Sequence, residues 1–311
     1  MAESKGSTAS SDLPLSLVAG ASLKTYRSKL QPYYYLCKPG IVYSNVLSGV
    51  AGYIFASKWN LDIKHLLALT AGTGLIIASA CVANNYIDRG IDSKMKRTKI
   101  RASVTGVISG TNMILFSLIL GIIGFTVLFL TNILTVYIGV FAFISYVGVY
   151  GYVKRKSIYG TLAGTLPGGA SIVAGYSAAT GELNLAALLL LLIMITWQMA
   201  HFYSIAIYRI DEYKKTKLPL WPIVKGIRSA KIQIGLFAVL FIISNWALSI
   251  FGYAGELYSI LMTIVGLIWF RIILSGKNTK NDQLWAKKSF LFSLITLLTF
   301  FILLPFSFLL P

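Results

Sequence analysis

Acidic side chains and cysteines are scarce in this chain of 311 residues, which has ten Asp and Glu residues and two cysteines. The two cysteines, Cys37 and Cys81, provide neither a disulfide framework nor a thiolate metal site. No acidic residue falls in the middle of an apolar run, whereas ion-coupled transporters usually bury ionisable groups near the bilayer midplane. These absences argue against a disulfide scaffold, a thiolate metal centre and an ion-coupled transporter.

Apolar residues, by contrast, are abundant, since they make up 56% of the chain and the mean hydropathy is +0.74. Apolar runs of about 20 residues, each long enough to cross a bilayer as a helix, recur along the chain. The runs are continuous and do not alternate with polar residues, which argues against a β-barrel. We therefore predict an all-α, polytopic membrane protein with nine spans, at roughly 41–57, 65–87, 112–130, 133–152, 160–179, 184–207, 232–251, 257–274 and 289–308.

The basic residues indicate an orientation for these spans. Of the 28 Lys and Arg residues, 26 lie in alternate segments that share one side of the membrane, namely 1–40, 88–102, 153–157, 208–231 and 271–288. The other two, Lys58 and Lys64, lie in the first loop on the opposite side. The positive-inside rule then predicts a cytoplasmic N-terminus and an external C-terminus. Topology and anionic lipid account for the net charge of +18, so no nucleic-acid partner is expected.

The N-terminal segment differs in composition from the rest. Residues 1–33 are polar and rich in serine, without the apolar core of a signal peptide, so we expect a cytoplasmic tail. A transit peptide is the alternative, against which Glu3 and Asp12 argue. Residues 34–311 are expected to form one transmembrane domain.

Two loops on the predicted cytoplasmic side concentrate the remaining polar residues. The first, NNYIDRGIDSKMKRTKIR at 84–101, places Asn84, Asp88 and Asp92 four residues apart, and hence on one face if the segment is helical. The second, YRIDEYKKTKLPLWPIVKG at 208–226, contains Asp211 and Glu212 among basic residues. Mg²⁺ binds through one or two carboxylates and substrate phosphates, while Lys and Arg neutralise the remaining charge. The loops therefore predict a site for an isoprenoid diphosphate, although the basic residues alone need no function beyond topology.

The first loop also matches a known pattern. N-N-Y-x-D-R-x-x-D-x-x-M-x-R-T resembles the first signature of the UbiA superfamily of intramembrane prenyltransferases, and the double asparagine is typical of its branch that farnesylates protohaem IX. Further segments agree in order: LCKPGIVYSN at 36–45, VKRKSIYGT at 153–161, WQMAHF at 197–202 and LPLWPIVKG at 218–226.

This resemblance implies a fold and an activity. The fold would be a ring of nine helices around a central cavity that opens to the membrane. The activity would be Mg²⁺-dependent transfer of a farnesyl group from farnesyl diphosphate to a vinyl group of haem b, giving haem O. The expected location is the bacterial plasma membrane, with the mitochondrial inner membrane as the alternative. A haem–copper oxidase assembly or a haem A synthase would be the expected protein partner.

The resemblance also implies roles for individual residues. Asp88, Asp92 and Glu212 would bind Mg²⁺, with Asp211 left open as the acid of the second motif because the family usually has an aspartate where Glu212 stands. Asn84 would act with these acids in catalysis. The substrate-binding residues would be Lys38, Asn45, Asn85, Arg89, Arg97, Lys154, Arg155, Gln198, His201, Asp211 and Lys225. For His201, a contact with the haem iron, a bond to a propionate, a proton transfer and simple helix packing all remain open.

Some residues depart from the family pattern around the acceptor. Ala102, Ser171 and Ala200 stand where prolines are expected. Two alternatives therefore remain: a prenyltransferase for an aromatic acid or quinone precursor, and a non-catalytic haem or lipid carrier. Only the carrier hypothesis predicts that Asp88 and Asp92 are dispensable.

The fifth predicted span contains glycines with small residues four positions apart. Gly160, Gly164, Gly168, Gly169 and Gly175 all fall within it. Such spacing lets helix backbones approach closely in membranes, so these glycines predict tight packing without a ligand.

Overall fold

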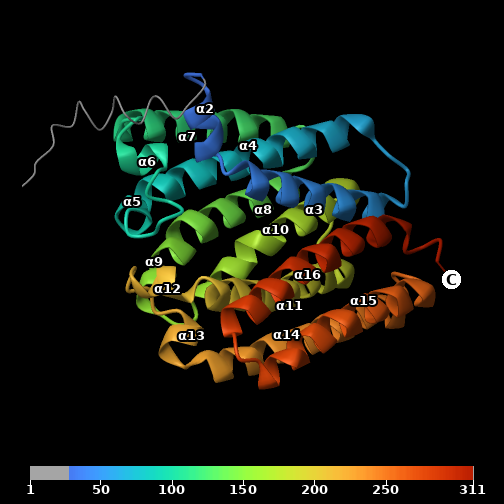
Figure 1. Cartoon of the computed structure of the whole chain (residues 1–311). Coiled ribbons are helices and arrows are strands. Elements are labelled where there is room, and N and C mark those ends of the chain that lie inside the picture. The colour runs from blue at the N-terminus through green and yellow to red at the C-terminus, as the bar shows by residue number, and fades with distance from the viewer. Residues whose placement is uncertain (1–27, 311) are drawn as a thin grey trace, which may run out of the picture.

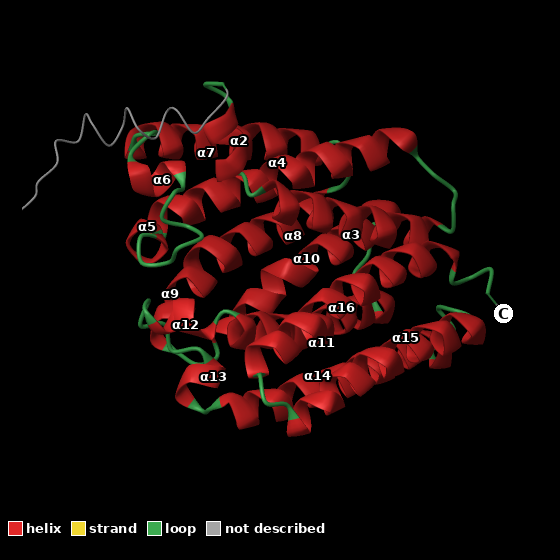
Figure 2. Ribbon diagram, in the orientation of Figure 1, coloured by secondary structure: helices red, strands yellow, loops and turns green. Residues whose placement is uncertain are grey.

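The computed structural model describes residues 28–310, and every regular element within this range is a helix (Figures 1 and 2). The first is α2 (Gln31–Leu36). The predicted cytoplasmic tail, residues 1–33, falls largely outside the described residues, and α2 begins just before its predicted end.

Each of the nine predicted spans overlaps one long helical segment. These segments are α3 (Pro39–Ser57), α4 (Ile63–Ile87), α7 (Gly110–Leu128), α8 (Ile133–Ile144) with its continuation, α10 (Gly160–Thr180), α11 (Leu185–Tyr208), α14 (Ile227–Ile250), α15 (Glu256–Leu274) and α16 (Asp282–Leu303). Helix α8 continues through the π-helix η1 (Ser145–Tyr150) into α9 (Gly151–Lys156). Short helices occupy the connections: α5 (Arg89–Asp92), α6 (Ala102–Thr105), α12 (Ile210–Lys214), α13 (Trp221–Val224), η2 (Ser275–Asn278) and η3 (Leu304–Phe306).

Eight of the described helical segments are long and apolar enough to cross a membrane, and α10 is not among them. The predicted count of nine is therefore not confirmed by length and composition alone. Helix α10 packs against α3, α8 and α11, and its residues 169–178 are all buried. Because other helices and not lipid surround this stretch, its small and polar residues carry no penalty for facing hydrocarbon.

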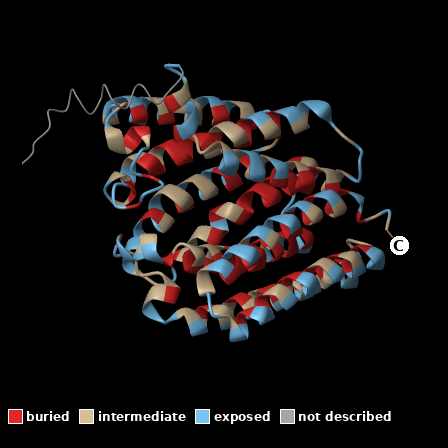
Figure 3. Cartoon of the chain, viewed as in Figure 1, coloured by how far each residue is buried: buried red, intermediate tan, exposed pale blue. Residues whose placement is uncertain are grey.

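The other long helices present apolar side chains outward. On α7, for example, Leu118 and Ile122 are 56% and 67% exposed. Figure 3 shows the same division, with buried residues along the inner helix faces and exposed residues along the outer ones. Such a surface suits a protein whose solvent is lipid, since the hydrocarbon is as apolar as these side chains.

The short helices α5, α6, α12 and α13, together with α9, gather at one end of the bundle, opposite the C-terminus (Figure 1). We call this the motif end, because both polar loops, 84–101 and 208–226, lie there.

Two pairs of neighbouring helices, α3 with α10 and α4 with α7, are in close contact. Between α3 and α10, a Cβ added to Gly175 would lie 1.9 Å from the carbonyl oxygen of Gly49. Between α4 and α7, the hydroxyl of Ser79 donates to the backbone carbonyl of Ser117 at 2.7 Å, and the hydroxyl of Ser117 donates to the backbone carbonyl of Ser79 at 2.9 Å. Gly175 of the fifth predicted span thus acts in packing, as predicted, whereas Gly160, Gly164 and Gly168 line the cavity described below.

Candidate active site

Asp88 lies at the C-terminal cap of α4, where two cations from α9 meet its carboxylate. Lys154 Nζ lies 2.5 Å from Asp88 Oδ2, and Arg155 Nη2 lies 2.9 Å from Oδ1. Lys154 Nζ also donates to Asn84 Oδ1 at 3.0 Å. Asn84 and Asp88, one helical turn apart, therefore share one lysine, and the predicted basic pair of residues 154 and 155 is brought to the first motif.

Asp92 belongs to a second cluster, because α4 ends before Asp88 and α5 begins a new short helix. Arg101 Nη1 lies 2.6 Å from Asp92 Oδ2 and 3.3 Å from Asn85 Oδ1. The predicted single helical edge is thus interrupted at Asp88, and the polar residues form two groups: Asn84 and Asp88 meet Lys154 and Arg155, whereas Asn85 and Asp92 meet Arg101. Asn85 further donates to the carbonyl of Leu36 at 2.7 Å, which ties α4 to α2.

Arg101 was absent from the residues predicted for the site. The only sequence signal for it is that it precedes Ala102, which stands where the family pattern has a proline, and nothing in the spacing links it to Asp92. Its side chain is 24% exposed, whereas that of Asp92 is 5% exposed, so the pair lies at the boundary of the interior.

In the second motif the two adjacent acids behave differently. Asp211 is exposed and accepts a bond from Gln283 Nε2 of α16 at 2.7 Å. Glu212 is half-buried; its Oε1 lies 3.3 Å from Arg209 Nη1, and its Oε2 is buried without a hydrogen-bond partner. A buried carboxylate oxygen without a partner is costly unless a cation or donor completes it. Glu212 therefore has a buried carboxylate oxygen without a partner, whereas the carboxylate of Asp211 is exposed.

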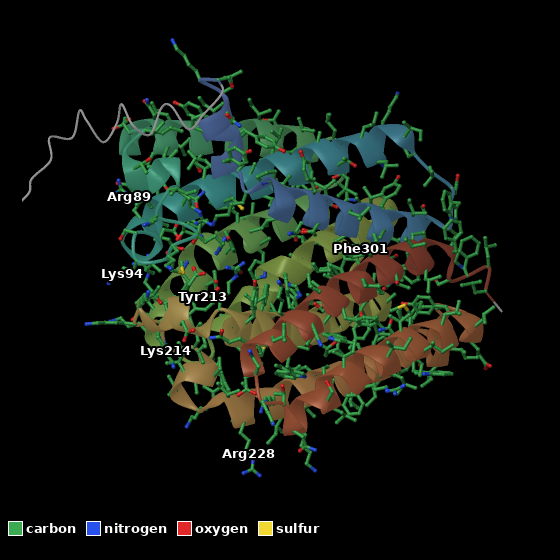
Figure 4. All side chains as sticks on the ribbon, in the orientation of Figure 1. Arg89, Lys94, Tyr213, Lys214, Arg228 and Phe301 are labelled. Atoms are coloured by element: carbon green, nitrogen blue, oxygen red, sulfur yellow. The ribbon has the colours of Figure 1, made fainter. Side chains whose placement is uncertain are left out.

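The residue after Glu212 connects the two motifs. Burial raises the pKa of the Tyr213 phenol, while the positive charges of Arg97, Arg209 and Arg101 act in the opposite direction. These arginines come from both loops, so they lie near the phenol together. Figure 4 shows Tyr213 at the motif end with Arg89 and Lys94 of the first loop and Lys214 of the second.

A cavity of about 640 Å³ opens behind this polar end. Its lining runs from Tyr213 at the motif end to Phe301, which lies two residues before the end of α16. Among the predicted site residues, those that line it are Asn45, Arg97, Lys154, Gln198 and His201. Most other lining side chains are apolar or aromatic. The cavity is therefore elongated and apolar, with cations at one end.

The π-helix η1 shapes one wall of this cavity. Tyr146 and Tyr150 line it and stack with ring centroids 5.6 Å apart, and Lys154 Nζ lies 4.8 Å from the Tyr150 ring. Segments of π-helix occur frequently at functional sites because they rotate side chains out of the regular helical register. Tyr146 and Tyr150 were not predicted, since the sequence shows no sign that this segment departs from an α-helix.

Two of the predicted cavity residues already have partners. Gln198 Nε2 donates to the carbonyls of Thr165 and Met194 at 3.2 and 3.1 Å, so its amide ties α11 to α10. Asn45 donates to the carbonyl of Ile41 at 2.9 Å and accepts from the hydroxyl of Ser171 at 3.1 Å. Both amides contribute to the wall of the cavity, and both also serve helix packing.

The remaining predicted residues lie away from the cavity lining. Arg89 stacks 4.1 Å above the Tyr86 ring and donates to the carbonyl of Tyr86, and Lys225 is exposed at the end of α13. Lys38 caps α3 with a positive φ of 52°. Burial lowers the pKa of Lys38, while the charges of Asp92 and Asp88 act in the opposite direction, which places it within electrostatic reach of the first motif.

The acids fit a divalent cation only with the help of a ligand. Within residues 28–310, no three His, Cys, Asp or Glu side chains lie close enough together to hold a metal ion by themselves. Mg²⁺, however, typically uses one or two carboxylates and completes its shell with substrate phosphates and water. Buried Asp88 and Asp92 and the unpartnered oxygen of Glu212 fit that donor set.

Fold and site together define a polytopic helical membrane protein whose apolar cavity is lined at one end by cations, one of which, Lys154, contacts the carboxylate of Asp88. The chain belongs to the UbiA prenyltransferase family, which its residues 45–295 match. The resemblance predicted from the first motif is thereby confirmed.

Its relatives include bacterial proteins named Protoheme IX farnesyltransferase. The protein from Serratia proteamaculans (strain 568) is 42% identical over 281 residues, which cover 90% of this chain and 95% of the relative. The protein from Cronobacter sakazakii (strain ATCC BAA-894) is 42% identical over 284 residues, which cover 91% of this chain and 96% of the relative.

Solved structures share the fold at lower sequence identity. A structure described as Digeranylgeranylglyceryl phosphate synthase has a TM-score of 0.75 and 20% identity, and the match covers 90% of this chain and 98% of that one. A UbiA homolog from Archaeoglobus fulgidus bound to GPP and Mg²⁺ has a TM-score of 0.69 and 18% identity, covering 88% of this chain and 99% of that one. The predicted all-α polytopic fold is confirmed.

Proposed function

We propose that this chain transfers the farnesyl group of farnesyl diphosphate to a vinyl group of protohaem IX, giving haem O. The observation that carries the proposal is the 42% identity, over 90% of the chain, to bacterial proteins named for this reaction. The acids and cations clustered at one end of an apolar cavity support it, because they suit the charged diphosphate while the apolar lining suits the prenyl tail.

The balanced reaction consumes one water. The bond between C1 of the farnesyl group and the diphosphate oxygen breaks, and its electron pair leaves with the diphosphate. The π electrons of the vinyl group form a new carbon–carbon bond to C1. Water then adds to the resulting carbocation and loses a proton, which leaves a hydroxyethylfarnesyl side chain.

The side chains at the motif end would hold the leaving group. Asp88, Asp92 and Glu212 would hold Mg²⁺, which when bound offsets the negative charge on the diphosphate. Lys154 and Arg155 contact the Asp88 carboxylate and lie within reach of phosphate oxygens bound at the same place. Their positive charges would stabilise the charge that develops as the diphosphate leaves.

The cavity would hold the rest of both substrates. Its apolar lining, from Ile76 and Ile77 on α4 to Leu297 and Phe301 on α16, would exclude bulk water from the allylic cation until the vinyl group reacts. The faces of Tyr146 and Tyr150 would also stabilise positive charge through their π electrons.

Glu212→Gln is expected to lower the rate of transfer about tenfold or more, whereas Asp211→Asn is expected to change it less than about twofold. The physical reason is that Glu212 Oε2 is buried and has no partner, while Asp211 is exposed and bonded to Gln283. Both variants remove one acid from the same motif, so each controls for the other. Rates measured across a Mg²⁺ titration would check this, and equal losses in the two variants would contradict the assignment.

The acceptor can be tested directly with purified protein in lipid. Given Mg²⁺ and farnesyl diphosphate, the protein is expected to convert haem b into a more apolar haem and to leave 4-hydroxybenzoate unchanged, as chromatography would show. Prenylation of the aromatic acid without reaction of haem would move the protein to another branch of its family. Binding of both substrates without any transfer would favour a carrier.

We further propose that the motif end faces the cytoplasm of a bacterium, with the chain in the plasma membrane. Support comes from the positive-inside rule, since only Lys58 and Lys64 among the 28 basic residues fall in an external segment. Delivery of the product to a haem–copper oxidase assembly or to a haem A synthase stays a prediction.

A further inference from the structure

His201, in the wall of the cavity, has one of its two ring nitrogens already bonded. Its Nδ1 lies 2.6 Å from the hydroxyl oxygen of Ser293 on α16. The Ser293 hydroxyl itself donates to the carbonyl of Phe290 at 2.6 Å. A serine hydroxyl has a single hydrogen, so towards the histidine it can only accept. The hydrogen-bond network therefore assigns the proton to Nδ1 and leaves the lone pair on Nε2.

The imidazole ring is also held in place by its neighbours. Trp197 stacks on it with centroids 4.5 Å apart and an interplanar angle of 23°, and Phe290 lies 5.1 Å away on α16. Trp197 Nε1 donates to the carbonyl of Ser293 at 2.8 Å. The tryptophan and the histidine, one helical turn apart on α11, are thus both bonded to the same serine. Rotation of the imidazole would break the bond to Ser293 and disturb the stack.

A fixed neutral imidazole with a free Nε2 is the usual form of a histidine that binds a metal. Such histidines commonly donate their other N–H to a fixed oxygen, which sets the tautomer and makes the free nitrogen a better ligand. Histidine is also a common axial ligand of haem iron.

We infer that Nε2 of His201 binds the iron of the porphyrin acceptor, and that Ser293 is the positioning residue that orients this nitrogen. The inference rests on the proposed function, because it places the acceptor on the wall formed by α11 and α16. It also assigns a role to Ser293, which the sequence did not single out.

The test uses the full chain in lipid nanodiscs, with ferric haem and iron-free protoporphyrin IX as two probes. His201→Ala is expected to remove the Soret band of imidazole-bound haem and to weaken haem binding about 10- to 100-fold. Binding of protoporphyrin IX, which offers no iron, is expected to change less than about threefold, because the aromatic wall remains. His65→Ala is the matched control, since His65 is the chain's other histidine and pairs with Asp62 far outside the cavity.

Ser293 needs two variants, because its loss could disturb packing. Ser293→Ala is expected to weaken haem binding about tenfold and to shift the Soret band, since either ring nitrogen could then carry the proton. Ser293→Thr keeps the hydroxyl and is expected to restore both the affinity and the spectrum. Binding of farnesyl diphosphate, measured in each variant, reports whether the site remains folded.

Three results would overturn the inference. If haem binds to His201→Ala with an unchanged spectrum, the iron ligand lies elsewhere and the proposed function stands. If His201→Ala weakens haem and protoporphyrin IX equally, His201 is a packing residue. If the unmodified protein neither binds nor converts haem, the proposed function fails with the inference.

Discussion

Replacing Asp88 with asparagine is expected to reduce prenyl transfer about a hundredfold or more, the range seen when one preorganised electrostatic group is lost. The carboxylate meets both Lys154 and Arg155, so its loss removes a metal ligand and leaves two cations without their counter-charge. The amide oxygen can still accept one bond, and the protein is therefore expected to remain folded with a lowered melting temperature. Breaking a buried ion pair costs about 3–5 kcal/mol.

Asp92→Asn is expected to separate the effect on prenyl transfer from the effect on stability. Its partner Arg101 is partly exposed and can be solvated, so the stability loss is expected to be smaller while the loss of transfer is similar. Asp282→Asn is the matched control, because Asp282 pairs with Lys231 at 2.5 Å but belongs to neither motif. Transfer rates and melting temperatures of the three variants would be compared. Retained Mg²⁺-dependent activity in both motif variants would refute the site.

Replacing Gly175 with alanine is expected to prevent folding or to destabilise the protein severely. The added Cβ would lie 1.9 Å from the carbonyl oxygen of Gly49 and 2.9 Å from the backbone nitrogen of Tyr53. Both contacts are backbone atoms, which cannot move aside as a side chain can, so α3 and α10 would have to separate. Overpacking commonly costs about 1–3 kcal/mol, and a clash with rigid backbone exceeds that range.

Gly235→Ala provides the control for this prediction. Gly235 also lies inside a membrane helix, α14, but a Cβ there would meet only side-chain atoms at 3.8 and 3.9 Å. We expect a neutral or slightly stabilising effect of up to about 1 kcal/mol, since alanine favours the helix over glycine. Thermal unfolding in detergent would measure both variants. A melting temperature of Gly175→Ala equal to that of Gly235→Ala would show that α3 and α10 are not in contact as described.

The sequence predicted the chemistry of the first motif but not its geometry. Spacing placed Asn84, Asp88 and Asp92 on one edge of one helix, whereas α4 ends before Asp88 and Asp92 lies in α5. This interruption of the helix changes which cation pairs with which acid. Lys154 and Arg101 are 66 and 9 residues from their partners along the chain, and no local pattern links either pair.

The sequence by itself determined the membrane class, the position of each long helix and the two acidic loops, because hydrophobic runs and charge clusters are local properties of the chain. Tertiary structure alone decided three further points. It left an oxygen of Glu212 without a partner while bonding Asp211 to Gln283, it buried the small and polar residues of α10 among other helices, and it placed Ser293 beside His201. The physical reason is the same in each case. Which polar atom is satisfied depends on what another helix brings to it, and helices that meet through side-chain packing are far apart in the sequence.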